Sequence, residues 1–169
     1  MTAPDSIAAR LVALEAETAV RRLVARYFRL CDRLDSGSDI SLIGALFTQD
    51  ARWRGVGSYG VYEGRTAIIA MLRAYGAPEP HFRMNAHFLT GEDIRVDGDV
   101  AVGRWTMLQC STYHDGTSDL RSAALTIGCA VEDGRWRIAD FLTESLFSRR
   151  VDRWSDAAAI PVPVTPRTI

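Results

Sequence analysis

The sequence predicts an α+β fold, in which N-terminal helices pack against a strongly bent antiparallel sheet. Apolar residues recur at helical spacing before residue 50, strand-like runs fill residues 82–147, and Asp-Gly turns join those runs. Helices followed by an antiparallel meander are typical of α+β proteins rather than of alternating α/β proteins. A sheet curved around the long helix would enclose a core open at one end, and 169 residues suffice for one domain.

The first element is expected to be a long amphipathic helix. Its apolar stripe, which follows the i, i+3, i+4 spacing of a helix face, consists of Val20, Leu23, Val24, Tyr27, Phe28, Cys31 and Leu34. Asp5 or Ser6 could cap an earlier turn of this helix. Residues 35–39 end it, and Asp39 can cap a short second helix.

Changes in residue composition along the chain predict the remaining elements. Residues 51–63 are rich in Gly, Trp and Tyr and suit a hairpin or an extended arm, and Gly64 precedes a short third helix that residues 76–80 break. Four strands are then predicted over residues 84–96, 100–113, 121–131 and 136–147. The Pro-rich residues 160–166 cannot form a helix or a central strand. We therefore expect one domain over residues 1–150 and an extension over residues 151–169.

Composition excludes several functional classes. The 20 basic and 21 acidic residues nearly balance, and every basic residue is an arginine, which rules out lysine bases and Schiff-base chemistry. The arginines are scattered, so no nucleic-acid partner is expected, and no apolar run approaches the roughly 20 residues of a membrane helix. The three cysteines form no CxxC pair, and we expect them to be buried and reduced. The expected compartment of the protein is therefore the reducing cytoplasm.

Two motif-like features favour structural interpretations. Residues 55–60 read G-x-G-x-x-G, but no helix can begin inside that string, as dinucleotide binding requires, so loop glycines are the better interpretation. His81, His87 and His114 lack the close spacing or neighbouring ligands of a metal site. Neither a cofactor nor a metal is expected.

His87 is the strongest candidate for chemistry. Alternation places it with Asn85 and Leu89 on one face of an otherwise apolar strand. Asp32 lies at the edge of the helical stripe, and a partly buried carboxylate needs a hydrogen-bonded partner. An Asp–His pair would fix the imidazole tautomer and leave the other nitrogen free to take a proton. The alternatives are a structural core histidine and a helix-capping aspartate.

Aromatic residues concentrate in the middle of the chain, where Trp53, Tyr59, Tyr62, Trp105 and Tyr113 occur. They could form core packing, or they could line an apolar cavity for a small hydrophobic ligand.

Several short motifs resemble one family. They are Tyr27, Asp32 and Asp35 at the end of the first helix, LFTQDA over residues 46–51, YEGR over residues 62–65, His87-Phe88, and VDGDVA over residues 96–101. Together they resemble the SnoaL-like branch of the nuclear transport factor 2-like superfamily over about residues 8–150. The resemblance implies a cone-shaped barrel formed by the bent sheet and the helices, with an internal apolar pocket.

The resemblance also implies a site. Scytalone dehydratase and the bile-acid dehydratases of this superfamily use an Asp–His pair, which matches Asp32 and His87, and the bile-acid enzymes have a tyrosine that matches Tyr27. Scytalone dehydratase has a tyrosine where this chain has Cys31, and a second histidine where the next strand has Gln109 and Ser111. Scytalone itself is therefore not the expected substrate.

The sequence thus predicts a cofactor-free dehydratase or isomerase for a small hydrophobic cyclic or polycyclic carbonyl compound. Asp32, His87 and Tyr27 are the predicted catalytic residues, and the predicted substrate-binding residues are Trp53, Tyr59, Trp105 and Gln109. The alternative is a ligand-binding or subunit-type protein without activity, since members of this superfamily differ in function. A homodimer or homotrimer is expected from the resemblance.

Overall fold

Helices and strands follow one another in the predicted order in the computed structural model, which describes residues 6–34, 38–55, 60–76 and 79–152. The elements are α1 (Ile7–Cys31), α2 (Ile40–Gly44), β1 (Phe47–Gly55), β2 (Gly60–Glu63), α3 (Arg65–Gly76), β3 (Phe82–Asp97), β4 (Val100–Tyr113), β5 (Ser118–Glu132) and β6 (Arg135–Val151). The α+β prediction is confirmed. Most of the Pro-rich extension lies outside the described residues.

The strands form one six-stranded sheet in the order β2-β1-β6-β5-β4-β3. β3 to β6 are the predicted antiparallel meander, and β1 and β2 pair as the hairpin expected near residues 51–63. β1 joins the meander by pairing parallel to β6, with Trp53 opposite Phe141. β2 and β3 are the two edges, so the sheet is curved but does not close into a barrel.

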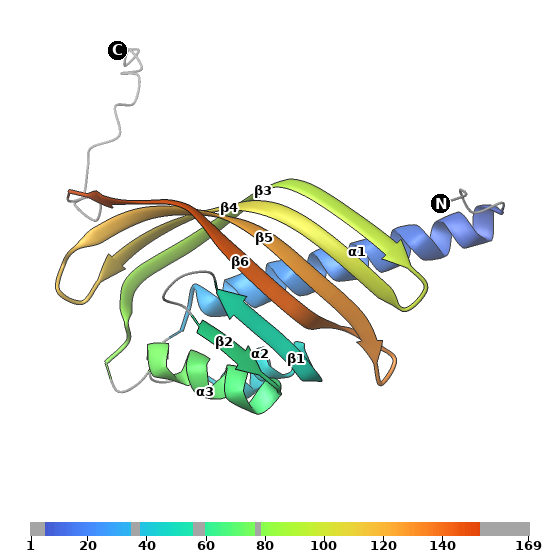
Figure 1. The fold of residues 1–169 in the computed structure, drawn as a ribbon, viewed down its shortest axis with the longest axis horizontal. Coiled ribbons are helices and arrows are strands. Elements are labelled where there is room, and N and C mark those ends of the chain that lie inside the picture. Colours follow the sequence, from blue (N-terminus) through green and yellow to red (C-terminus); the bar gives the residue numbers. More distant parts are fainter. Residues whose placement is uncertain (1–5, 35–37, 56–59, 77–78, 153–169) are drawn as a thin grey trace, which may run out of the picture.

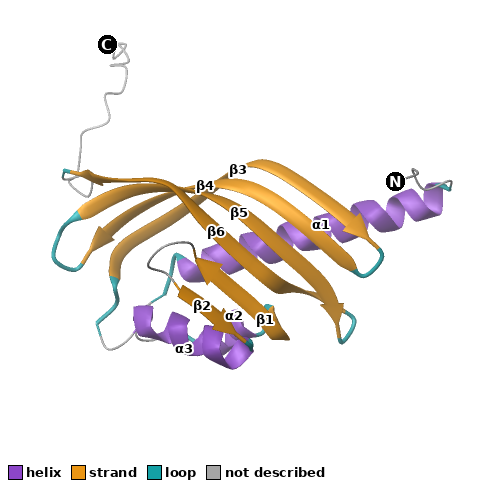
Figure 2. Ribbon diagram, viewed as in Figure 1, coloured by secondary structure: helices purple, strands orange, loops and turns teal. Residues whose placement is uncertain are grey.

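The helices all lie on the concave side of the sheet (Figures 1 and 2). α1 crosses beneath the meander and contacts β3 and β6, whereas α3 packs on β1 and β2 and against α2. No helix of the described segments is both long enough and apolar enough to cross a membrane.

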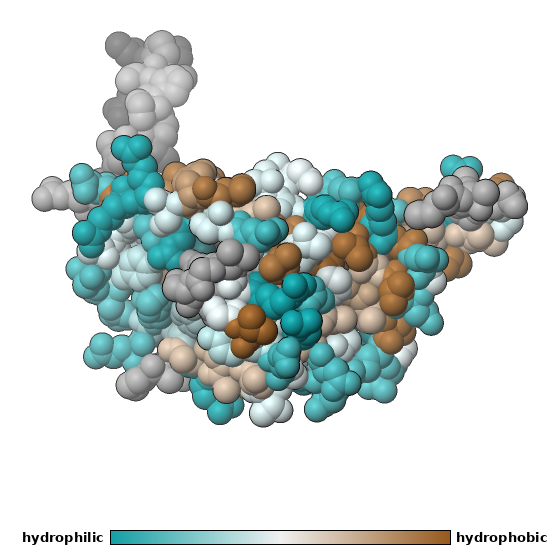
Figure 3. All heavy atoms as spheres, in the orientation of Figure 1, coloured by the Kyte–Doolittle hydropathy of each residue, from teal (hydrophilic) through white to brown (hydrophobic). Residues whose placement is uncertain are grey.

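α1 is a single helix whose two halves have different surroundings. Ser6 caps it by accepting a hydrogen bond from the backbone N–H of Ala9, as predicted for one of two candidate caps. The predicted stripe from Val20 to Phe28 is buried. In the first half, by contrast, Ile7 and Leu14 are exposed, because this half extends past the sheet (Figures 1 and 3).

The YEGR motif has a structural role at the start of α3. Arg65 donates from Nε to the carbonyl oxygen of Phe47 and from Nη2 to Glu132. Glu132 also accepts from the backbone N–H of Gln49. Gly64, with φ of 82°, makes the turn before the helix in a conformation that other residues rarely adopt. These contacts tie α3 to β1 and to the end of β5.

Candidate active site

The helices and the concave face of the sheet enclose a cavity of about 370 Å³. This volume is within the range of small-molecule sites. Its aromatic wall comprises Tyr27, Phe28, Trp53, Tyr62, Tyr75, Phe82 and Phe141. Tyr27 and Phe28 belong to α1, and the Trp53 and Phe141 rings stack with centroids 5.7 Å apart. The cavity is therefore built by aromatic residues from both ends of the chain.

His87 lines this cavity and contacts Asp32, which is not itself one of the lining residues. Asp32 follows the last residue of α1, and His87 lies on the cavity-facing side of β3. His87 Nδ1 is 2.6 Å from Asp32 Oδ1, and the two side chains are 10% and 25% exposed. The His87 ring also packs 4.9 Å from that of Phe28. A neutral imidazole that donates from Nδ1 to the carboxylate keeps its lone pair on Nε2.

Tyr27 also lines the cavity, with its hydroxyl deeply buried. The hydroxyl accepts a 3.4 Å hydrogen bond from Trp53 Nε1. Burial raises the pKa of Tyr27 well above its usual value, and the neighbouring Cys31 thiol adds to the effect. Burial likewise raises the pKa of Cys31 to about 12. At neutral pH both groups keep their protons, so the phenol can act as a hydrogen-bond donor.

Sequence reasoning missed polar residues on the other wall of the cavity. Asn85, Gln109 and Arg121 all line it, and only Gln109 was among the predicted site residues. Arg121 donates from Nε to Asp119 and from Nη2 to the Tyr113 hydroxyl, each at 2.6 Å. The position of Asn85 on the His87 face was a signal that could have identified it.

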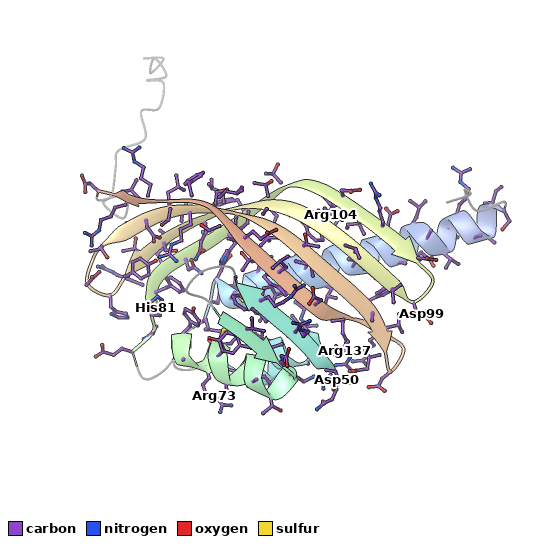
Figure 4. All side chains as sticks on the ribbon, viewed as in Figure 1. Asp50, Arg73, His81, Asp99, Arg104 and Arg137 are labelled. Atoms are coloured by element: carbon purple, nitrogen blue, oxygen red, sulfur yellow. The ribbon has the colours of Figure 1, made fainter. Side chains whose placement is uncertain are left out.

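His81 immediately precedes β3, is labelled in Figure 4, and is one of the residues that line the cavity. Burial and the nearby Arg121 cation both lower the pKa of His81, which favours its neutral form. Its ring packs against those of Tyr75 and Tyr113.

The structure separates Trp105 from the other predicted binding residues. Trp105 is buried, but it is not among the residues that line the cavity. Its indole lies back over Gly103, and Nε1 donates to Glu92 at 3.3 Å. The expectation that Trp105 lines the pocket is therefore corrected, whereas Trp53 and Gln109 do line it. Tyr59 lies outside the described residues.

The described segments contain no group of three or more His, Cys, Asp or Glu side chains arranged to hold a metal ion. The G-x-G-x-x-G string runs from the last residue of β1 to the first residue of β2, two paired antiparallel strands. It does not connect a strand to a helix, as the dinucleotide-binding motif does.

The family model described as "SnoaL-like domain" matches residues 12–141. A solved structure named as a putative scytalone dehydratase from Novosphingobium aromaticivorans is 19% identical, with a TM-score of 0.71, and the match covers 90% of this chain and 96% of the other. A putative aromatic ring hydroxylase from the same organism is 20% identical, with a TM-score of 0.72 and coverage of 82% and 94%.

A third structure from that organism, named as an NTF2-like protein with a cystatin-like fold, is 27% identical. Its TM-score is 0.66, and the match covers 85% of this chain and 92% of the other. No curated protein sequence matches the chain significantly.

Proposed function

Because the chain belongs to the SnoaL-like domain family, we propose that it is a cofactor-free lyase of the dehydratase type, or an isomerase. Its substrate is a small hydrophobic cyclic or polycyclic carbonyl compound. The contact between Asp32 and His87 at the wall of an aromatic cavity carries this proposal. A structural neighbour named as a putative dehydratase supports the lyase class.

In the proposed mechanism, His87 Nε2 removes a proton from the carbon next to the substrate carbonyl. Asp32 holds the ring through Nδ1 and stabilises the imidazolium that forms. Tyr27 donates a hydrogen bond to the developing enolate or to the departing hydroxyl. Trp53 and Gln109 contact the bound substrate. Acid–base catalysis of this kind contributes about 10²- to 10⁴-fold in rate.

Hydrogen–deuterium exchange tests the proposed chemistry without knowledge of the natural substrate. A bicyclic ketone such as 2-tetralone, incubated with the protein in D₂O, should exchange its α-protons faster than it does alone. His87→Ala and Asp32→Asn should each lower the catalysed rate by about 10²- to 10⁴-fold. Proton NMR follows the exchange directly.

Matched substitutions at exposed positions provide the controls. His114→Ala removes a histidine in the β4–β5 turn, and Asp99→Asn removes a carboxylate in the β3–β4 turn. Both variants should exchange at the wild-type rate. If His87→Ala and Asp32→Asn also kept near-normal rates, the dyad would not be catalytic.

A second candidate is a non-catalytic ligand-binding protein or a small enzyme subunit. A structural neighbour named as a putative aromatic ring hydroxylase favours the subunit interpretation. Reproducible co-purification with a larger iron-containing chain would support it over the lyase.

The proposal extends to assembly and compartment. Exposed apolar side chains on the outer face of the sheet, among them the cross-strand pair Phe88 and Leu108, support a homodimer or homotrimer. The three free cysteines suit the reducing cytoplasm.

A further inference from the structure

Two amide side chains flank His87 on the polar wall of the cavity. Asn85 precedes His87 by two residues, so both side chains are on the same face of β3. Gln109 pairs directly with His87 across β3 and β4, and Ser111 pairs with Asn85. Asn85 and Gln109 line the cavity, whereas Ser111 is fully buried behind them. The proposed mechanism leaves Asn85 without a role.

Three hydrogen bonds fix the orientation of the two amides. Gln109 Nε2 donates to Asn85 Oδ1 at 2.9 Å and to Ser111 Oγ at 3.1 Å. Ser111 Oγ in turn donates to Asn85 Oδ1 at 2.9 Å. These bonds use the carbonyl oxygen of Asn85 and both N–H groups of Gln109. The Asn85 NH₂ group and the Gln109 carbonyl oxygen therefore remain available to hydrogen-bond a molecule in the cavity.

We infer that Asn85 Nδ2 donates a hydrogen bond to the substrate carbonyl oxygen, that Gln109 contacts the substrate beside it, and that Ser111 is a positioning residue. This inference rests on the proposed function. When His87 takes the α-proton, the C–H bonding pair becomes the C=C bond. The carbonyl π pair moves onto oxygen, which becomes negative. A donor already aimed at that oxygen stabilises the charge without reorganisation.

Strand geometry places this donor within reach of the same substrate. Residues i and i+2 of a strand are about 6.6 Å apart at Cα, so the Asn85 and His87 side chains can converge on neighbouring atoms. A ketone presents its oxygen and its α-proton on such neighbouring atoms. The Gln109 oxygen adds an acceptor beside the donor. The amide pair therefore fits a cyclic ketone that also carries a hydroxyl group.

Binding of 2-methoxynaphthalene and naphthalene tests the inference independently of turnover. The two probes share a ring system that fits the aromatic wall, and only 2-methoxynaphthalene has an oxygen, which can accept from Asn85 but cannot donate to Gln109. The wild-type protein should bind 2-methoxynaphthalene about tenfold more tightly than naphthalene, the effect of one net hydrogen bond. Fluorescence titration measures both affinities.

Asn85→Asp is the decisive variant. It keeps the oxygen that Gln109 and Ser111 contact and replaces the donor NH₂ by an acceptor. The preference for 2-methoxynaphthalene should disappear while naphthalene affinity stays the same. Ser111→Ala removes one positioning hydrogen bond and should lower the preference by a smaller factor, again without weakening naphthalene binding. Gln49→Glu makes the equivalent change of charge at an exposed position of β1 and should keep the full preference.

Equal binding of the two probes by the wild-type protein would overturn the inference. So would an unchanged preference in Asn85→Asp, or a parallel loss of both affinities. If Asn85→Asp does not fold, Ser111→Ala decides by the same criteria. His87→Ala should retain this binding preference, because the imidazole acts in proton transfer and not in the hydrogen bond to the oxygen of the probe. Failure of the dyad in the exchange assay is thus distinguishable from failure of the amide pair.

Discussion

At the scale of single residues, burial determines which cavity groups can carry charge. Asp32 remains partly exposed and contacts an imidazole, so its carboxylate has a partner. Tyr27 and Cys31 have no cationic partner among the described contacts, and burial raises the pKa of each. The carboxylate therefore has an imidazole as its partner, whereas the phenol and the thiol that line the same cavity stay neutral at neutral pH.

The two buried thiols make stability sensitive to alkaline pH. Burial raises the pKa of Cys31 and of Cys129 from 9.0 to about 12. Below pH 9 both thiols are neutral in the folded and unfolded states. Between pH 9 and 12 only the unfolded state loses these protons, so the free energy of unfolding should decrease by up to about 1.4 kcal/mol per pH unit for each thiol.

Urea unfolding at pH 8 and pH 10.5 measures this effect. Cys129→Ala removes one of the two thiols and should show a shallower decrease than the wild-type protein. Cys110, with its thiol less buried, is the comparison, and Cys110→Ala should alter the pH dependence less. If the free energy of unfolding decreased as much in Cys129→Ala as in the wild-type protein, the Cys129 thiol would not be a source of the alkaline sensitivity.

At the scale of elements, β4 illustrates how one strand serves two regions of the core. From Val100 to Gln109 its buried residues alternate strictly with exposed ones. Met107 and Gln109 face the cavity, but the Trp105 indole extends along the strand over Gly103. Face alternation predicted that Trp105 points inward. It could not predict the direction of the ring along the strand, which depends on the space above a glycine.

A methyl group at residue 103 should therefore destabilise the fold. Its Cβ would lie 2.1 Å from an atom of the Trp105 ring, which is 5% exposed and has little room to move. Gly103→Ala should lower the free energy of unfolding by about 1–3 kcal/mol. Gly128→Ala on β5 is the control, because its Cβ would make an ordinary 3.4 Å contact with Asp140. Equal stability of the two variants in urea unfolding would disprove this account.

At the scale of the whole molecule, local signals determined most of what could be predicted. The apolar stripe specifies α1, and the Asp-Gly turns specify the meander, because both signals depend only on residues that are close in the sequence. The parallel pairing of β1 with β6 depends on contacts between distant parts of the chain, such as Trp53 with Phe141, and was not predicted. Asp32 and His87 were paired by chemical need and family resemblance, whereas Asn85 required the observed hydrogen bonds.

The exposed apolar surfaces lead to a prediction about assembly. One is the outer sheet face around Phe88 and Leu108, and the other is the projecting half of α1. We expect the 18.7 kDa chain to elute as a dimer or trimer in size-exclusion chromatography with light scattering. Phe88→Arg should shift the mass toward the monomer, whereas Asp99→Asn should not. A wild-type protein that is monomeric at micromolar concentration would exclude this prediction.

The parallel pairing of β1 with β6 also sets an order of events during synthesis. β1 leaves the ribosome early, yet its partner residues 138–143 are made close to the end of the chain. Until then Trp53 lacks the ring against which it stacks, and the hairpin exposes an unpaired strand edge, which favours aggregation. A nascent chain that ends before residue 138 would therefore have helices and most of the meander but no finished chamber. The aromatic wall is therefore complete only once β6 has been made.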